Sequence, residues 1–215
     1  AYLSLTKENP DIVKTAHQRL YNEIVEYGVD KLDSSDPRCQ SIFGGERVRT
    51  YEYFKDEFFG METVISKIMR FLSSAAHKGE ESRQVLLLLG PVGAGKSALT
   101  EHIKRSLEHS RFFHIEGDPQ RGEPLQLIPR SLRSKFEEML EVKIDGDISP
   151  IVRHRLLEEL GGEYEKFNIV ESSFSQRARR GIAVVPPMDP NSQDTSVLIG
   201  SEDISKLDLY PEDDP

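Results

Sequence analysis

The sequence has few of the residues that build covalent or metal-based frameworks. It contains one cysteine, Cys39, among 215 residues, so neither a disulfide framework nor a thiolate metal cluster can form within the chain. A single cysteine fits a reducing compartment, and we expect Cys39 to be inert rather than reactive. The six histidines show no paired spacing such as H-x-x-x-H, so a metal site built from protein ligands alone is not expected.

Long apolar runs and a basic charge excess are also absent. No run approaches the ~18 residues of a membrane span, and the N-terminus has no basic stretch followed by an apolar one. We therefore expect a soluble, cytoplasmic protein without a membrane partner. The formal net charge is -9, which argues against a protein that wraps nucleic acid with a broad basic face.

What the sequence does contain is a phosphate-binding pattern. Residues 90–97, read as Gly-Pro-Val-Gly-Ala-Gly-Lys-Ser, fit the P-loop pattern G-x-x-x-x-G-K-[ST]. The apolar run 84–89 before the loop has the length of a buried parallel strand. After the loop, Leu99, Ile103 and Leu107 recur at four-residue spacing, as on one face of a helix. The alternative is a chance glycine loop before a helix, and the two flanks favour the P-loop.

The residue types in this loop match the chemistry of phosphate binding. The glycines allow backbone conformations closed to residues with a Cβ, so that N–H groups can turn towards an anion at the start of the helix. Lys96 is expected between the β- and γ-phosphates, and Ser97 is expected to place its hydroxyl on Mg²⁺. The implied ligands are ATP and Mg²⁺. The residues of this segment predicted to contact the nucleotide are Gly90, Pro91, Val92, Gly93, Ala94, Gly95, Lys96, Ser97 and Ala98.

A helical arm precedes this domain. Asn9-Pro10 is a typical helix start, and the apolar positions from Val13 to Ile24 mark one helical face that ends near Gly28. The arm either packs against the main domain or docks a partner. We place the boundary so that residues 1–50 are the arm and its loop, and residues 51–215 are the P-loop domain.

The element pattern predicts an α/β fold, namely a three-layer P-loop NTPase of AAA+ type with a parallel sheet. Strands are expected at 111–115 and 167–171, with 181–185 as a further candidate. Helices are expected at 129–140, with Leu132, Phe136, Met139 and Leu140 inward, and from Ser149-Pro150 to Leu160.

An aromatic turn lies between the arm and the P-loop. A helix is expected from Val64 to Ala76, where apolar residues recur at three- and four-residue spacing. Before it, Phe59-Gly60-Met61-Glu62 resembles the short turn that contacts the adenine in AAA+ ATPases. Phe59 and Gly60 are therefore candidate nucleotide contacts. The alternative is that Phe58 and Phe59 belong to the core, and the two interpretations are compatible.

The second motif of a working P-loop NTPase is not evident. Such enzymes deliver an Asp to the Mg²⁺ shell from an apolar strand, often beside a Glu. Glu116 and Glu171 follow strand candidates but lack the apolar lead and the paired carboxylates. We expect the motif to lie beyond Pro215. The basic cluster 177–180 could supply an arginine finger, although a solvated turn is the ordinary interpretation.

Taken together, these residues resemble the N-terminal AAA domain of PrkA-type bacterial serine protein kinases. The resemblance covers nearly the whole chain and is most specific in its early and P-loop motifs. The family often has Gly where this chain has Ala94. The matching segments are Asp36-Pro37-Arg38, Ile42-Phe43, 53–62, 87–97, Gly181-Ile182, 191–196 and Gly200-Ser201.

The resemblance implies an ATP-binding AAA module of a longer protein that phosphorylates serine in a protein substrate. It leaves open a homo-oligomer and an ATP-driven remodelling or proteolytic machine, since some members have been linked to proteolysis. A module that senses nucleotide without turnover is a third alternative. The kinase motifs G-x-G-x-x-G, H-R-D and D-F-G are absent, so catalytic residues are not assigned.

Overall fold

A computed structural model describes residues 1–32, 48–108 and 110–185. Cys39 lies outside these residues, as do the matching segments at 36–43, 191–196 and 200–201 and the acidic C-terminal residues. The elements are α1 (Tyr2–Glu8), η1 (Pro10–Val13), α2 (Ala16–Val25), β1 (Val29–Lys31), β2 (Arg49–Tyr51), η3 (Glu52–Phe54), α3 (Glu62–Ala76), η4 (Glu80–Arg83), α4 (Lys96–Leu107), β3 (Arg111–Ile115), η5 (Pro124–Leu127), α5 (Arg130–Leu140), α6 (Pro150–His154), η6 (Arg155–Glu159), η7 (Tyr164–Lys166) and β4 (Ile169–Ser173).

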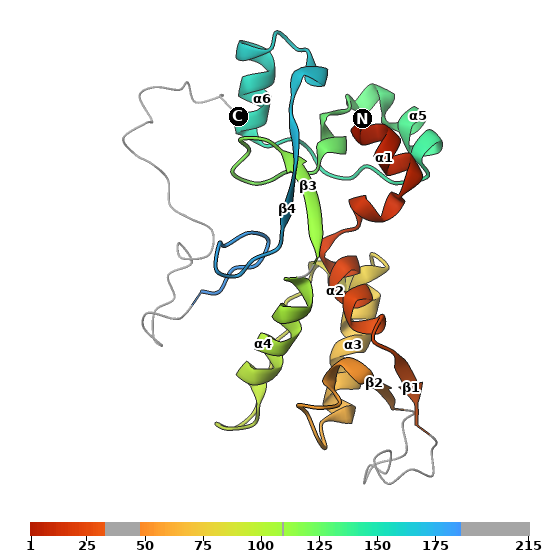
Figure 1. Cartoon of the computed structure of the whole chain (residues 1–215), viewed down its shortest axis with the longest axis vertical. Coiled ribbons are helices and arrows are strands. Elements are labelled where there is room, and N and C mark those ends of the chain that lie inside the picture. Colours follow the sequence, from red (N-terminus) through yellow and green to blue (C-terminus); the bar gives the residue numbers. More distant parts are fainter. Residues whose placement is uncertain (33–47, 109, 186–215) are drawn as a thin grey trace.

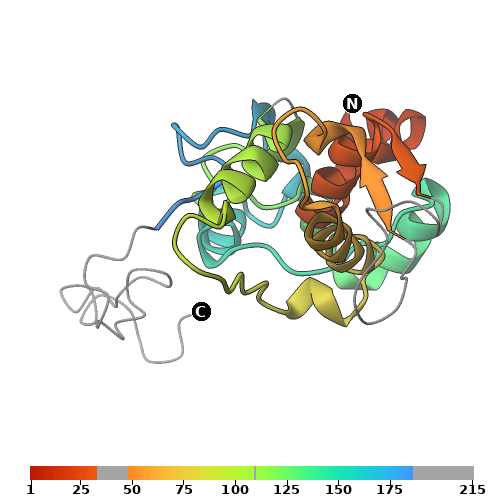
Figure 2. The same ribbon diagram turned by 90° about the horizontal axis from the view of Figure 1, so that it is seen from below.

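The elements gather in two groups (Figure 1). The first group holds α2, α3, α4 and the β1–β2 ribbon, around a cluster that includes Ile24, Phe54, Met69 and Leu99. The second holds α1, α5, α6 and the β3–β4 ribbon, with Ile115 among the fully buried side chains of its clusters. A further cluster of Leu107, Phe174 and Ile182 joins α4 of the first group to the segment after β4 of the second. Seen from below, α3 and α4 lie side by side in projection, with the chain between them looping along one side (Figure 2).

The helices that carry the P-loop region follow their apolar periodicity. In α3, the buried positions recur every three or four residues, and they are Ile65, Ile68, Met69, Leu72, Ala75 and Ala76. In α4, Leu99 is buried in the first cluster and Ile103 packs against it, whereas Leu107 is buried in a separate cluster with Phe174 and Ile182. Both predicted helices are confirmed, because a stripe of apolar side chains at this spacing can be buried only by a helical backbone.

The predicted helix at 129–140 is confirmed as α5, but only part of its inward face is right. Phe136 and Leu140 pack into a cluster with residues of η5, whereas Leu132 and Met139 are exposed by 40% and 46%. The helix from Ser149-Pro150 begins as predicted, with the Ser149 hydroxyl accepting from Val152 N. It continues through a π-helical turn, η6, to Glu159.

The N-terminal arm packs against the rest of the molecule. The helix expected from Asn9-Pro10 is instead the short 3₁₀ turn η1, and α2 begins after a capping box between Thr15 and Gln18. Ile24 is fully buried in the same cluster as residues of α3 and α4. Strand β1 pairs with β2 in antiparallel register, with Val29 opposite Tyr51. This ribbon joins residues on both sides of the boundary predicted at 50/51, which stays a prediction.

The strands form two antiparallel ribbons, and the described residues contain no parallel sheet. Strand β3 lies where it was predicted, and β4 lies two residues beyond the expected 167–171. Their register pairs Arg111 with Ser173 and Ile115 with Ile169. The segment 181–185 was wrongly predicted as a strand, because past the turn closed by the Ser175–Arg180 bridge it has no strand partner among the described residues.

The apolar run 84–89 is also not a strand, which corrects the central element of the predicted sheet. Its backbone is irregular, and Val85, Leu87 and Leu89 are exposed by 91%, 72% and 84%. Only Leu88 packs against the core. No strand of the described residues runs beside this segment, so its N–H and C=O groups have no ladder partner and its side chains have no second layer to cover them.

A partly buried hydrogen bond joins the N-terminal helix α1 to the residue that precedes η5. The Tyr2 hydroxyl donates to Glu123 Oε1 at 2.6 Å, and burial raises the pKa of both Tyr2 and Glu123. Nearby, the Arg19 guanidinium donates to three backbone carbonyls, those of Ile12, Lys14 and Arg111. The arm is thus tied to the molecule by polar groups as well as by apolar contacts.

The Tyr2→Phe substitution should weaken this attachment. It removes one of the hydrogen-bond donors of the partly buried Glu123 carboxyl, so the free energy of unfolding should fall by about 1–3 kcal/mol. Urea denaturation monitored by circular dichroism measures it. Tyr27→Phe is the matched control, since Tyr27 is 60% exposed. An equal, small change in both variants would contradict the role of the Tyr2 hydroxyl.

The Glu123 carboxyl should also make stability depend on pH. Because burial raises its pKa in the folded state, the folded protein binds its proton more tightly than the unfolded protein does. This contribution is fully present below the unfolded value of about 4.3 and is lost as pH rises through the folded value. Between a pH of about 4.3 and the raised folded-state pKa, the melting temperature should therefore change less with pH in Glu123→Gln than in the wild type. The control Glu138→Gln, at an exposed residue, should keep the pH dependence of the wild type.

Candidate functional site

The glycine loop lies at the free end of α4. Residues 90–95 connect the exposed run 84–89 to Lys96, the first residue of the helix. Gly93 and Gly95 have φ of +81° and +76°, a left-handed region where residues with a Cβ are strained. The pattern of glycines in the sequence therefore corresponds to a real backbone requirement at these two positions.

The loop offers hydrogen-bond donors that the protein does not use. Its internal backbone bond joins Ala94 N to Pro91 O at 3.3 Å, and the first bond of α4 runs from Leu99 N to Gly95 O. In the described part of the chain, no acceptor is found for the N–H groups of Val92, Gly93, Gly95, Lys96 and Ser97. These donors sit at the positive end of α4, which favours an anion there.

Lys96 folds back over the loop. Its Nζ donates to the carbonyl oxygens of Gly90 and Pro91 at 2.8 and 2.7 Å, so the ammonium lies within the loop rather than extended into solvent. Both acceptors are neutral carbonyls. An anionic oxygen in the loop would be a stronger partner for this ammonium.

Ser97 and Ala98 occupy the first turn of α4, and both are exposed. The Ser97 hydroxyl has no hydrogen-bond partner among the described residues, in contrast to Thr100, whose hydroxyl donates to Lys96 O at 2.9 Å. The same residues hold no group of three or more side chains that could bind a metal. Ser97 is therefore free to give one oxygen to a metal that a ligand brings with it.

The turn at 59–61 lies against this loop. Gly60 has a φ of +72°, and a Cβ placed on Gly95 would lie 3.7 Å from the sulfur of Met61. Phe58 is 8% exposed and belongs to the core, whereas Phe59 is 80% exposed. The core interpretation is thus confirmed for Phe58 and wrong for Phe59, whose exposed ring is available to a ligand.

A polar clamp joins the segment 53–57, just before this turn, to α4, and the sequence does not signal it. The Tyr53 hydroxyl donates to the His102 carbonyl at 2.7 Å, and His102 Nε2 lies 2.9 Å from the Tyr53 carbonyl. Glu57 then lies between His102 Nδ1, at 3.1 Å, and the Arg105 guanidinium, at 3.5 Å. The ring of Phe54 packs beside the imidazole, with centroids 5.5 Å apart. No spacing in the sequence signals these contacts, because they join segments about fifty residues apart.

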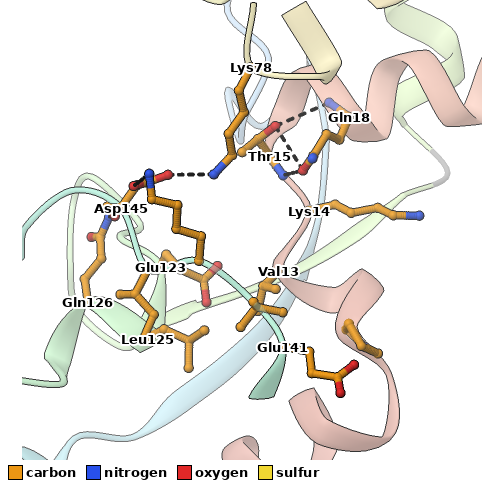
Figure 3. Close-up of a pocket in the computed structure, with 14 residues that line it drawn as sticks. Val13, Lys14, Thr15, Gln18, Lys78, Glu123, Leu125, Gln126, Glu141 and Asp145 are labelled. Carbon is orange, nitrogen blue, oxygen red and sulfur yellow. Dashed lines mark hydrogen bonds and ion pairs between the residues drawn. The ribbon is translucent and has the colours of Figure 1, made fainter. Parts of the chain in front are cut away.

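Two hollows of the described surface lie outside the glycine loop. One, of about 460 Å³, opens beside Phe59 and is lined by the rings of Phe54 and Phe58 with Glu52 and Glu62, but by no residue of the loop. The other, also about 460 Å³, lies between the arm and residues 141–145 (Figure 3).

The charges around the second hollow are already paired. Lys78 Nζ lies 2.6 Å from an oxygen of Asp145, and Lys143 contacts the other oxygen of the same carboxylate. The dashed lines of Figure 3 also show the capping box between Thr15 and Gln18 at its rim. Because these groups satisfy one another, the hollow offers an anionic ligand less than the glycine loop does.

The secondary acidic and basic candidates do not join the loop. Strand β3 extends beyond the C-terminal end of α4, away from the loop (Figure 1). Glu116 follows that strand and accepts from Asn168 at 2.9 Å, and Glu171 pairs with Arg111 at 3.4 Å. In the cluster 177–180, Arg180 donates to the Ser173 hydroxyl at 3.2 Å.

Comparisons with known proteins identify the family of the chain. The PrkA AAA domain family matches residues 1–215. The chain is 34% identical over 222 residues to ATP-dependent protease PrkA of Bacillus subtilis (strain 168), covering 100% of this chain and 33% of that protein. It is 33% identical over 222 residues to serine/threonine kinase YeaG of Escherichia coli (strain K12), covering 100% of this chain and 34% of that protein. No solved structure matched the chain.

A shorter region resembles a further protein. Over 67 residues, 31% of this chain and 6% of the relative, the chain is 31% identical to a mitochondrial Lon protease homolog of Drosophila melanogaster.

The described residues include no helix with the length and apolarity to cross a membrane. The chain spans about a third of the length of the two bacterial relatives. The family match over its whole length and the identity to these relatives show that the chain belongs to the PrkA AAA domain family.

Proposed function

We propose that residues 90–98 bind ATP with Mg²⁺, and that the full protein uses this nucleotide to phosphorylate serine in a protein substrate. The observation that carries the nucleotide proposal is the row of unused N–H donors at the start of α4, with the Lys96 ammonium inside the same loop. In the proposed complex, the β-phosphate accepts from backbone N–H groups between Val92 and Gly95. Lys96 releases its carbonyls and contacts the β- and γ-phosphates, and Ser97 contributes an oxygen to Mg²⁺.

The adenine is proposed to lie against the turn at 59–61. Support comes from the proximity of Met61 to Gly95 and from the exposed ring of Phe59, since aromatic surface suits a planar base. The two hydrogen bonds between Tyr53 and His102 join the segment before this turn to α4 without a bound ligand. Phe59 and Gly60 are therefore the proposed base contacts.

The phosphoryl-transfer proposal rests on the name of the Escherichia coli relative, and the rival rests on that of the Bacillus subtilis relative. In the rival function, ATP hydrolysis drives remodelling or proteolysis of a partner.

We also propose that the run 84–89 becomes a strand of a parallel, three-layer sheet when further strands lie beside it. Its exposed apolar side chains support this, because a parallel strand needs cover on both faces. A cytoplasmic setting, a homo-oligomer and a role without nucleic acid or membrane belong to the same proposal.

Lys96→Ala should weaken ATP binding. Removal of a charged phosphate contact worth ~1.5–3 kcal/mol corresponds to roughly a ten- to hundredfold loss of affinity. Isothermal titration calorimetry with ATP and Mg²⁺ measures it. Lys135→Ala is the control, because Lys135 is an exposed lysine on α5. Equal affinities of the two variants for ATP would contradict the proposed contact between Lys96 and the phosphates.

Gly95→Ala should weaken ATP binding through the backbone. At a φ of +76°, alanine costs roughly 1–2 kcal/mol, which the loop avoids by rotating its N–H groups away from the ligand. Gly161→Ala is the matched control, because Gly161 also has positive φ, +59°, and open space around it. Both variants should lose stability, but only Gly95→Ala should lose nucleotide affinity.

A transfer assay with γ-labelled ATP separates the functions. Label recovered on serine of a protein supports the kinase, and label found only in free phosphate supports the ATP-driven machine. Tight binding without either product indicates a nucleotide-sensing module. Residues 1–215 alone should bind ATP with little hydrolysis. Turnover on the order of 1 s⁻¹ by residues 1–215 would contradict the expectation that the acidic motif lies beyond Pro215.

A further inference from the structure

His102 is a polar side chain buried among aromatic rings of the first cluster. The residue is 8% exposed, and the rings of Tyr53, Phe54 and Phe58 lie against the imidazole, with centroids 4.4, 5.5 and 5.3 Å away. Burial of a polar side chain costs free energy unless its nitrogens find partners. An apolar side chain would fill the same space without that cost, so packing alone does not account for a histidine here.

Both ring nitrogens of His102 face oxygen atoms of the segment 53–57. Nε2 lies 2.9 Å from the Tyr53 carbonyl, and Nδ1 lies 3.1 Å from a carboxylate oxygen of Glu57. The other oxygen of Glu57 lies 3.5 Å from Arg105, one turn further along α4. Polar contacts depend on direction and distance, whereas apolar packing is non-directional. These contacts therefore fix where the segment 53–57 lies along the helix.

The aromatic turn that follows is held by α4 at two points. At one point, Phe58 packs against the His102 ring. At the other, Met61 lies beside Gly95, the residue that caps the N-terminus of α4. Positions 95 and 102 are seven residues apart, which corresponds to about 10 Å along a helix axis. Between the two points the chain exposes Phe59-Gly60, the proposed base contacts.

We propose that His102 is a positioning residue that couples recognition of the base to recognition of the phosphates. It contacts neither part of the nucleotide in the proposed complex. It holds Phe59 at a fixed distance from the glycine loop, so that one ligand with a base and a triphosphate engages both surfaces at once. The site thereby prefers a nucleoside triphosphate to an inorganic polyphosphate. This inference rests on the proposed nucleotide binding at residues 90–98 and the proposed base contact at Phe59.

The affinities for two ligands test this coupling in the full-length protein. Isothermal titration calorimetry with Mg²⁺ compares ATP with inorganic tripolyphosphate, which has the phosphate chain but no base. The wild type should bind ATP at least about tenfold more tightly, because stacking on an aromatic ring stabilises a bound base. His102→Ala should weaken ATP binding by about the same factor and leave tripolyphosphate binding unchanged.

His114→Ala is the matched control for the loss of a buried histidine. His114 is 9% exposed on β3, and its ring nitrogens lie 3.0 Å from the Ile115 carbonyl and from the Ser172 hydroxyl. This variant should lose stability without a change in the ratio of the two affinities. If His102 had only a structural role, His102→Ala would likewise weaken both ligands alike or neither, and that result would overturn the proposal.

A double variant shows whether His102 acts through the base contact. Phe59→Ala removes the aromatic surface itself, so it should also weaken ATP binding and spare tripolyphosphate. If His102 acts by placing Phe59, the combined variant should bind ATP about as weakly as Phe59→Ala alone, because losses within one interaction are not additive. Fully additive losses would refute the positioning role.

Two milder variants carry the test if circular dichroism shows that His102→Ala is unfolded. His102→Gln retains an N–H donor for the Tyr53 carbonyl and should keep most of the preference for ATP. Tyr53→Phe removes the hydroxyl that donates to the His102 carbonyl and should lose part of that preference. The reverse order of the two variants, or no change in either, would overturn the proposal.

Failure of the nucleotide proposal would look different. In that case the wild type would bind neither ATP nor tripolyphosphate. If the wild type bound both ligands with equal affinity, the coupling of base and phosphates would be refuted, and the phosphate site at the glycine loop would stand.

Discussion

The clamp between the aromatic turn and α4 is the contact on which the candidate site depends. Tyr53 and His102 each satisfy the other's backbone carbonyl, and the rings of Phe54 and Phe58 pack beside the imidazole. A buried polar group that loses its partner costs about 1–3 kcal/mol, so sliding one segment along the other would break both bonds at once. The segment before the turn is therefore held in one register against α4, six residues before the turn whose Met61 lies beside the glycine loop.

The glycine loop and the turn before α3 are joined through one helix. The loop presents backbone N–H groups and one ammonium, an arrangement that suits a compact phosphate chain. Helix α3 begins at Glu62, directly after Met61, and Met61 lies against Gly95. The position of the turn relative to the loop therefore depends on how α3 packs in the core.

Features set by neighbours in the chain were predictable. The apolar spacing of α3 and α4 predicted both helices and their buried faces, and the glycines at 93 and 95 marked positions of positive φ. One local signal was overlooked. Thr15 and Gln18 form a capping box, and their spacing, together with the 3₁₀ turn before it, starts α2 later than Asn9-Pro10 suggests.

What the sequence alone determined is the helices α3, α4 and α5 and the glycine positions of the loop, because dihedral preferences and helical periodicity act over a few residues. Strand pairing and burial were decided only by the tertiary structure. The run 84–89 is apolar, yet most of its side chains are exposed. Phe58 and Phe59 are neighbours in the sequence, but Phe58 lies in the core and Phe59 in solvent. Both outcomes depend on whether a partner from a distant part of the chain lies alongside. Local pattern cannot supply that information, because the hydrogen bonds and contacts that stabilise a strand or bury a ring come from residues far away in the sequence.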